Sequence, residues 1–320
     1  MKEIVTIILN WNKSEMTIKT FENISEIEKD RTDFIIVDNG SENSEKEKLI
    51  DYAKRKNWKI LKEGYEFLEN LIEDKGRSSN TILYILNKNY GYAKGNNFGL
   101  RLADSLGYKY AIIANNDVIL EEEVIDKLLE VILTNEDVCV VGPRIIGPNG
   151  KTQGPYFIRP NLFSELFYPI FYIFYIYYKK KVYNKKIIFP YGVIGCFMLL
   201  KLKCMKKVDF FDENTFLYSE EEILSEKMRL IRKKTAYRND VYIKHLHGLS
   251  SNEHGEKKKF LFSLKSGLYY YEKYRNYGKF RLFLVKIGRY YRFFILEPMI
   301  RKIKSVIKRI RNILENIKRR

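Results

Sequence analysis

The sequence is poor in cysteine, which limits the redox and metal sites it can form. Its three cysteines are Cys139, Cys196 and Cys204. They form no Cys-x-x-Cys pair, and their odd number argues against a disulfide framework. We therefore expect each to be a small buried apolar residue, in a protein that works in a reducing compartment.

The sequence also lacks a long uninterrupted apolar run. Residues 1–3 lead directly into a strand pattern that turns polar by Asn10, so we expect no signal peptide. The most apolar stretch, residues 162–178, contains Glu165 and Pro169 and is rich in Tyr. It is therefore a poor membrane-spanning helix and fits an interfacial segment better.

Acidic residues are scarce near the carboxyl end. The net charge is +18, but residues 251–320 alone carry 20 Lys and Arg against 5 Glu, a local charge of +15. Residues 1–250 are thus almost neutral at +3. Because no nucleic-acid-binding motif accompanies the basic segment, we expect no nucleic-acid partner.

The glycine motifs of nicotinamide and ATP sites are missing. Residues 89–97 place Gly91 and Gly95 close to a helix start, where backbone N–H groups can face an anion. The segment is not Gly-x-Gly-x-x-Gly, and it lacks the Lys-Ser/Thr ending of a P-loop. Both kinds of nucleotide site are therefore disfavoured.

Apolar strand patterns alternate with helix patterns through the first 150 residues. Strands separated by helices favour an α/β fold, with a mainly parallel sheet covered by helices on both faces. Residues 65–80 are polar and poorly patterned, which indicates a surface insertion. We expect strands at residues 4–9, 34–37, 59–64, 82–86, 110–114, 138–141, 194–200 and 242–247, and a helix at 219–233.

Polar residues follow two of the expected strands. Asn115, Asn116 and Asp117 come after the run 110–114, at the sheet edge where ligands bind in such folds. One carboxylate with open coordination positions suits a divalent cation that also holds a diphosphate. The alternative is that Asp117 caps the next helix. Asp38 ends an earlier strand, and it either forms a turn or accepts a hydrogen bond from a pyrimidine ring.

A second acidic cluster, Glu220, Glu221 and Glu222, follows the apolar segment 210–218. A solvated first turn of a helix is the simpler interpretation. The apolar segment favours the other one, since a partly desolvated carboxylate has a raised pKa and can act as a general base.

The only histidines are His245, His247 and His254. In a strand, His245 and His247 point the same way, so one can bind a metal while the other contacts a phosphate. A hydrogen-bonded structural role is the alternative.

Further on, residues 300–317 place eight aliphatic residues on one helix face and Lys and Arg on the other. This pattern favours attachment to an anionic membrane over a helix packed on the core.

Taken together, these segments resemble a family 2 glycosyltransferase of the GT-A fold, near the rhamnosyltransferase-like branch that builds bacterial surface polysaccharides. The resemblance covers about residues 3–250 and implies a Rossmann-like sheet. The matching segments occur in order at residues 10–12, 37–41, 89–97, 115–117, 195–198, 211–213, 216–221 and 245–250.

The resemblance implies an inverting transfer from a nucleoside-diphosphate sugar, UDP- or dTDP-linked and including rhamnose, to an acceptor hydroxyl. Residues 115–117 stand where the family has its Asp-x-Asp motif, so Asp117 would bind Mn²⁺ or Mg²⁺ with His247 or His245. Asp38 matches the acid that binds the nucleobase. The other donor-binding positions are Asn10, Asn12, Gly91, Asn97, Asn115 and Asn116.

Glu221 matches the position of the catalytic base, with Glu220 as the alternative. Residues 1–250 would form the catalytic domain, with a donor half at 1–150 and an acceptor half at 151–250. Residues 251–320 would be a basic helical extension that attaches the protein to the cytoplasmic face of the plasma membrane. The acceptor would be a glycan or a lipid-linked molecule. The alternatives are a non-catalytic membrane-surface module of the same fold and, less favoured, a nucleic-acid binder.

Overall fold

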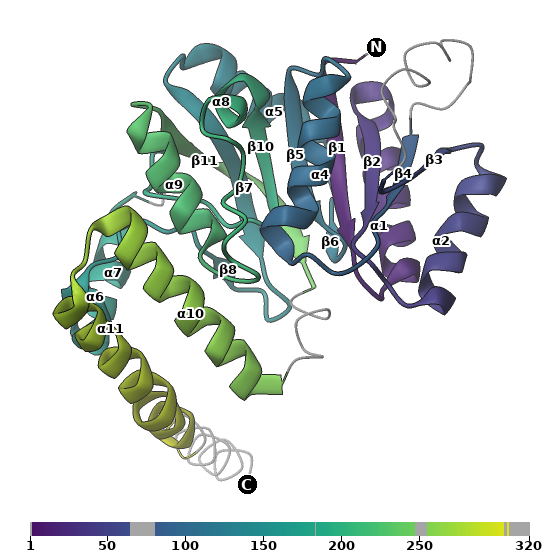
Figure 1. Cartoon of the computed structure of the whole chain (residues 1–320). Helices are drawn as coiled ribbons and strands as arrows, with labels where there is room; N and C mark the ends of the chain where they lie inside the picture. The colour runs from purple at the N-terminus through teal and green to yellow at the C-terminus, as the bar shows by residue number, and fades with distance from the viewer. Residues whose placement is uncertain (1, 65–80, 183, 247–254, 304–305, 307–320) are drawn as a thin grey trace, which may run out of the picture.

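The computed structural model describes residues 2–64, 81–182, 184–246, 255–303 and 306. The expected insertion at residues 65–80, His247 and most of the terminal helix lie outside the described residues. Figure 1 shows a single large sheet with helices packed against it, and a group of helices from the carboxyl-terminal part at one end.

Eleven strands form one mixed sheet, in the order β3-β4-β2-β1-β5-β10-β7-β11-β6, with β8 beside β7 and β9 beside β11. Strands β3, β4, β2, β1 and β5 are mutually parallel, and β7 is parallel to β11. Strand β10 runs antiparallel between β5 and β7. The strands are β1 Ile4–Asn10, β2 Asp33–Asp38, β3 Lys59–Lys62, β4 Thr81–Ile85, β5 Tyr110–Asn115, β6 Val118–Ile119, β7 Val138–Ile146, β8 Thr152–Gln153, β9 Ile187–Ile188, β10 Phe197–Lys201 and β11 Lys234–His245.

Helices cover both faces of the sheet, as the α/β pattern predicts (Figure 1). Helices α1, α2 and α5 pack on one face, and α4, α8 and α9 pack on the other. The helices are α1 Ser14–Glu28, η1 Lys29–Arg31, α2 Asn43–Arg55, α4 Tyr92–Ser105, α5 Ile125–Thr134, α6 Leu162–Leu166, α7 Tyr168–Val182, α8 Leu202–Lys207, α9 Glu220–Leu230, α10 Gly255–Arg275, α11 Lys279–Tyr291 and the π-helical turn Arg292–Leu296.

The two-residue period of the strands divides the core into two layers. In β1, Ile4 and Ile8 face the layer of α1 and α5, while Val5 and Ile7 face the layer of α4. All four are completely buried, and each such side chain contributes about 1.5–3 kcal/mol to folding. This burial fixes the sheet, and with it the positions of the strand ends.

Strand β11 is longer than expected. It begins at Lys234 rather than near Tyr242, and its pairing with β7 has register shifts after Lys234 and after Arg238. The irregularity interrupts the apolar pattern, which explains why the sequence predicts only its second half.

The carboxyl-terminal helices pack firmly on the rest of the chain. A methyl group added at Gly288 would lie 2.7 Å from the carbonyl oxygen of Glu165, so α11 and α6 are in close contact. The buried Arg289 guanidinium also pairs with the Glu165 carboxylate at 2.8 Å. Tyr271 of α10 donates its hydroxyl to the same carboxylate at 2.9 Å.

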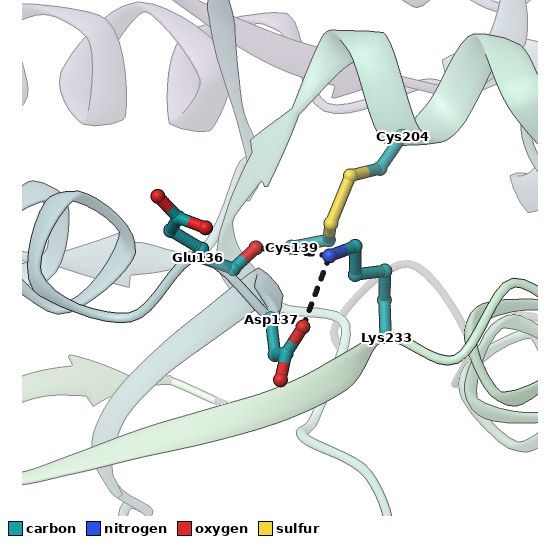
Figure 2. The surroundings of a disulfide bond; sticks show 5 residues. All are labelled: Glu136, Asp137, Cys139, Cys204 and Lys233. Atoms are coloured by element: carbon teal, nitrogen blue, oxygen red, sulfur yellow. Dashed lines mark hydrogen bonds and ion pairs between the residues drawn. A yellow bond between two sulfur atoms is a disulfide. The ribbon is translucent and has the colours of Figure 1, made fainter.

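The expectation about the cysteines is wrong for two of them, and the reducing compartment inferred from it loses that support. Figure 2 shows a disulfide that joins Cys139 at the start of β7 to Cys204 in α8. Their Cα atoms are 6.2 Å apart, within the range that disulfides span. The pair is separated by 65 residues, so only the packing of α8 on the sheet brings it together. Cys196 is free and buried, as expected for each cysteine.

We predict that the unfolded, unreduced protein has one reactive thiol, and that reduction adds two. Closing a loop of this length stabilises the fold by about 4 kcal/mol, so reductant should also lower the unfolding temperature. Thiol titration in denaturant, with and without prior reduction, measures the count. Three reactive thiols without reduction would contradict the disulfide.

Candidate active site

A cavity of about 1160 Å³ opens at the carboxyl ends of β1, β5 and β11. Three sets of acidic or basic side chains meet on its walls. Asp117 follows β5, His245 ends β11, and Glu220, Glu221 and Glu222 form the first turn of α9. The strand topology therefore brings together residues that are about a hundred positions apart in the sequence.

Asp117 and His245 form a close pair in the wall of the cavity. The imidazole Nε2 lies 3.1 Å from the Asp117 Oδ1, and both side chains are over nine-tenths buried. The Leu246 N–H also donates to the Asp117 carbonyl at 2.8 Å, which ties the end of β11 to the tip of β5. The helix-cap alternative for Asp117 is wrong, because α5 begins at Ile125 and Glu28 accepts its first N–H groups.

This pair suits a divalent cation. Gln153 Oε1 lies 3.0 Å from His245 Nδ1; as an acceptor it fixes the proton on Nδ1 and leaves a lone pair on Nε2. Nε2 lies close to Asp117 Oδ1, a buried oxygen that has no hydrogen-bond donor among the described residues. Two electron-rich atoms this close repel unless a positive charge lies between them.

No third His, Cys, Asp or Glu completes a metal cluster within the described ranges of the chain. Sites that hold Mg²⁺ together with substrate phosphates commonly use one or two protein ligands, and phosphate and water oxygens supply the others. The donor set of Asp117 and His245 fits that pattern. His247, the alternative ligand, lies outside the described residues.

A buried hydrogen-bond network connects the tips of β1, β2 and β5. The Asp38 carboxylate accepts from Asn10 Nδ2 at 2.8 Å and from the Ser41 hydroxyl at 2.5 Å. Asn10 Oδ1 accepts from the Thr17 hydroxyl at 2.7 Å, and Asn116 Nδ2 donates to the same hydroxyl at 3.0 Å. Asp38 and Asn10 have no exposed surface, so they lie behind the cavity wall, and Asn116 is the member that reaches it.

Asn12 and Asn97 are likewise engaged with the fold. Asn97 Nδ2 donates to the Phe211 carbonyl, and its Oδ1 accepts from the Phe211 N–H, both at 3.0 Å. Asn12 Oδ1 accepts from the Glu42 N–H at 2.8 Å. Direct contact of a donor with Asn10, Asn12, Asp38 or Asn97 stays a prediction; Asn115 and Asn116 line the cavity.

The N–H groups of residues 90–92, just before and at the start of α4, are already engaged within the fold. The Tyr90 and Gly91 N–H groups donate to the side chains of Asn39 and Asn89, and the Tyr92 N–H donates to the Phe216 carbonyl at 2.9 Å. Gly91 itself lines the cavity with a φ of +82°. A methyl group there would lie 2.3 Å from the Phe216 carbonyl oxygen, so only glycine fits.

The solvated-turn alternative is wrong for Glu220, which is buried, while Glu221 and Glu222 are half-buried in the wall of the cavity. Glu220 is 5% exposed, and its Oε1 has no hydrogen-bond partner within the described part of the chain. Glu221 Oε1 accepts from the Gly195 N–H at 2.9 Å. Tyr218 and Ser219, just before α9, both have left-handed backbone angles, with φ of 74° and 68°, a strain that is typical of functional sites.

Burial raises the pKa of all three carboxyl groups. It raises the pKa of Glu221 above its ordinary value of 4.5. Burial, followed by the charge of Glu221, raises the pKa of Glu220 well above that value and the pKa of Glu222 to about 7. The desolvated cluster therefore holds protons more tightly than free carboxyl groups do.

Residues 195 and 196 connect the two sides of the cavity. The Cys196 carbonyl accepts from the Asn115 N–H at 2.8 Å, next to the position of Asp117. Burial, and then the charges of Asp117 and Glu221, raise the pKa of the Cys196 thiol well above 9.0. Cys196 thus lies within electrostatic reach of both the donor-side carboxylate and the glutamate cluster.

Gly195 and Tyr92 lie beside the glutamate cluster, and sequence reasoning gives neither of them a role. The Tyr92 hydroxyl donates to the Gly195 carbonyl at 2.6 Å. A methyl group at Gly195 would lie 2.8 Å from Glu221 Oε1 and 2.9 Å from the Tyr92 hydroxyl. Both residues occur in the ordered segments of the resemblance, but no residue type or spacing in the sequence shows their contact with Glu221.

Two solved structures resemble this fold at low sequence identity. A crystal structure of GalNAc-T7 with UDP, GalNAc and Mn²⁺ superposes with a TM-score of 0.59 at 11% identity, covering 86% of this chain and 49% of that one. The mannosyltransferase PcManGT from Pyrobaculum calidifontis, in complex with GDP-Man and Mn²⁺, gives a TM-score of 0.55 at 12% identity, over 91% of this chain and 70% of that one. This chain therefore spans about half the length of GalNAc-T7. The fold is GT-A.

The family assignment comes from the sequence. No curated protein matches the chain as a close relative. The family model for glycosyl transferase family 2 matches residues 5–208, which is well over half of the chain. The chain belongs to glycosyl transferase family 2.

Proposed function

We propose that this protein transfers a sugar from a nucleoside-diphosphate sugar to an acceptor hydroxyl in one inverting, divalent-cation-dependent step. The observation that carries the proposal is that Asp117, His245 and Glu221 line one cavity, where the backbone of residues 195 and 196 is hydrogen-bonded both to Glu221 and to Asn115. The donor would be a UDP- or dTDP-sugar, with rhamnose among the sugars, in the synthesis of a surface polysaccharide.

The residues divide the chemistry between two sides. Asp117 and His245 would hold Mn²⁺ or Mg²⁺, which supplies positive charge to the departing diphosphate. Glu221 takes the proton from the acceptor hydroxyl as that oxygen attacks the anomeric carbon. The Gly195 N–H holds the Glu221 carboxylate in place. A single displacement by an oxygen on the side opposite the leaving group inverts the anomeric centre.

We also propose that the protein is peripheral at the cytoplasmic face of the plasma membrane, attached through residues 251–320. Within the described ranges, no helix has the length and apolarity needed to cross a bilayer. Residues 255–303 carry 13 Lys and Arg against 3 Glu, and such a surface is attracted to anionic lipids.

Asp117→Asn should abolish the Mn²⁺-dependent part of donor binding, because it removes the charge of the metal ligand and keeps its shape. Gln153→Leu should weaken that binding by about 10- to 100-fold, since Gln153 orients the His245 ring. Calorimetry with UDP- and dTDP-sugars, with and without Mn²⁺, measures both effects. Asp104→Asn, whose carboxylate pairs with Lys206 at the surface, is the matched control. Unchanged Mn²⁺ dependence in Asp117→Asn would contradict the assignment.

Glu221→Gln should retain donor binding and lose about 10²- to 10⁴-fold in the transfer rate, because it removes the base and not the metal ligands. Glu220→Gln, assayed in parallel, distinguishes the two candidates, since the larger loss identifies the base. Glu123→Gln at the surface is the control. Full transfer activity in both Glu220→Gln and Glu221→Gln would show that the base lies elsewhere.

The pH profile of transfer should have an acidic limb above the ordinary glutamate pKa. A general base must be unprotonated, so raising its pKa means that activity is lost as the pH falls through that higher value. Initial rates across the acidic range, at saturating donor and Mn²⁺, measure the midpoint of the limb. A rate that is still maximal at pH 4.5, the ordinary value, would contradict a buried carboxylate base.

A further inference from the structure

Exposed apolar side chains are concentrated in two parts of the chain. Of the 23 large hydrophobic residues that are exposed in the described residues, 19 lie in residues 163–177 or 261–306. The remaining four are scattered over the sheet domain. Large contiguous apolar surfaces on a folded protein mark interaction sites.

Helix α7 presents apolar side chains to solvent around most of its circumference. Ile173 is 67% exposed, Phe174 61% and Tyr177 71%. The short helix α6 adds Phe163 and Phe167 to the same part of the surface. The polar, water-facing side that most surface helices have is missing here, since residues 168–177 contain no charged side chain.

The second apolar surface is a stripe along α11 and its continuation. Exposed residues recur at three- and four-residue spacing on both sides of the π-helical turn Arg292–Leu296. Residues spaced four apart drift slowly around an α-helix, because one turn takes 3.6 residues. The π-helical turn takes in one extra residue, so the two halves of the stripe stay on one face. The stripe consists of Phe280, Phe283, Ile287, Tyr291, Ile295, Met299, Ile303 and Val306.

Packing contacts hold the two surfaces next to each other. The close approach of Gly288 to Glu165 and the buried Arg289–Glu165 ion pair fix α11 against α6. The Arg292 guanidinium lies 4.0 Å from the centre of the Tyr168 ring at the start of α7. Figure 1 shows α6, α7 and α11 gathered at one end of the molecule, beside α10.

The same helices also form one end of the active-site cavity. Helix α7 contributes Phe171, Tyr172 and Tyr175 to the lining, and the carboxyl-terminal helices contribute Phe260 and Phe293. The cavity therefore extends from the glutamate cluster of α9 to an aromatic end that adjoins the exposed apolar surfaces.

Charge decides which partner fits these surfaces. The described residues of the carboxyl-terminal helices carry a net charge of +10. A second copy of the chain, docked through the same surface, would bring two such positive faces together. Anionic lipid headgroups would neutralise the charge while the acyl chains cover the apolar side chains.

We propose that α6, α7, residues 279–303 and Val306 form one surface that inserts into an anionic bilayer around the aromatic end of the cavity, so that the acceptor is a lipid-linked molecule that enters from the bilayer. The part that concerns the acceptor rests on the proposed transferase function. The inserting surface includes α7, and so it does not depend on the basic extension alone.

Single cysteines at positions 173, 287 and 133, labelled with an environment-sensitive fluorophore, test the surface in the full-length protein. Cys139 and Cys204 are bonded and Cys196 is buried, so the introduced thiol is the accessible one. With vesicles of equimolar phosphatidylcholine and phosphatidylglycerol, labels in Ile173→Cys and Ile287→Cys should shift to the blue. The label in the control Leu133→Cys, also at an exposed apolar position, should not.

A shift at position 287 alone would overturn the role of α7, and no shift at either position would overturn the whole surface. A shift that appears without vesicles and grows with protein concentration would show a second copy as the partner and would also overturn the proposal. The pair Ile173→Glu and Phe174→Glu should lower vesicle affinity on the order of 10-fold or more. Nucleotide release from the donor without vesicles should be unchanged in this variant.

A polyprenyl phosphate with a photoreactive tail, held in the same vesicles, tests the acceptor. Crosslinks to peptides of α7 and residues 279–303 support entry from the bilayer, and crosslinks confined to other peptides overturn it. Failure of the proposed function would appear separately, as wild-type protein that binds and turns over no nucleotide sugar while the fluorescence shifts persist.

Discussion

Two backbone hydrogen bonds, made by adjacent residues, keep the two sides of the site in register. The Cys196 carbonyl accepts from Asn115 at the tip of β5, and the Gly195 N–H donates to the Glu221 carboxylate at the start of α9. One short segment just before β10 therefore sets the position of the proposed base relative to the residues that would hold the metal. A side chain at Gly195 would occupy the place of that carboxylate.

Burial determines which protons and ions this arrangement can bind. The Asp117–His245 pair and the glutamate cluster lie in one cavity. Desolvation there raises the pKa of Glu221. Asp117 Oδ1 is buried and has no hydrogen-bond donor among the described residues. Such a site favours a cation on one side and a proton acceptor on the other. The carboxyl-terminal helices line one end of the cavity, so the extension borders the site as well as forming part of the surface proposed to meet the membrane.

The fold and the main acidic groups follow from the sequence because both depend on local patterns. Alternating strand and helix periods predict the mainly parallel sheet, and polar residues at strand ends point to Asp117. Contacts across the fold do not have such patterns. The sequence therefore gives no role to Gly195, and it misses the disulfide between Cys139 and Cys204, which depends on helix packing. It also cannot show that Asp38 is enclosed by a hydrogen-bond network.

The central claim is that the donor-side pair and the glutamate base act from opposite sides of one anomeric centre in a single displacement. The most direct test is the anomeric configuration of the product, read from the one-bond C1–H1 coupling by NMR and compared with that of the nucleotide-sugar donor. The account predicts that the configuration is inverted. A product with the donor's configuration would contradict it, because retention requires a second displacement or a different placement of the reacting groups.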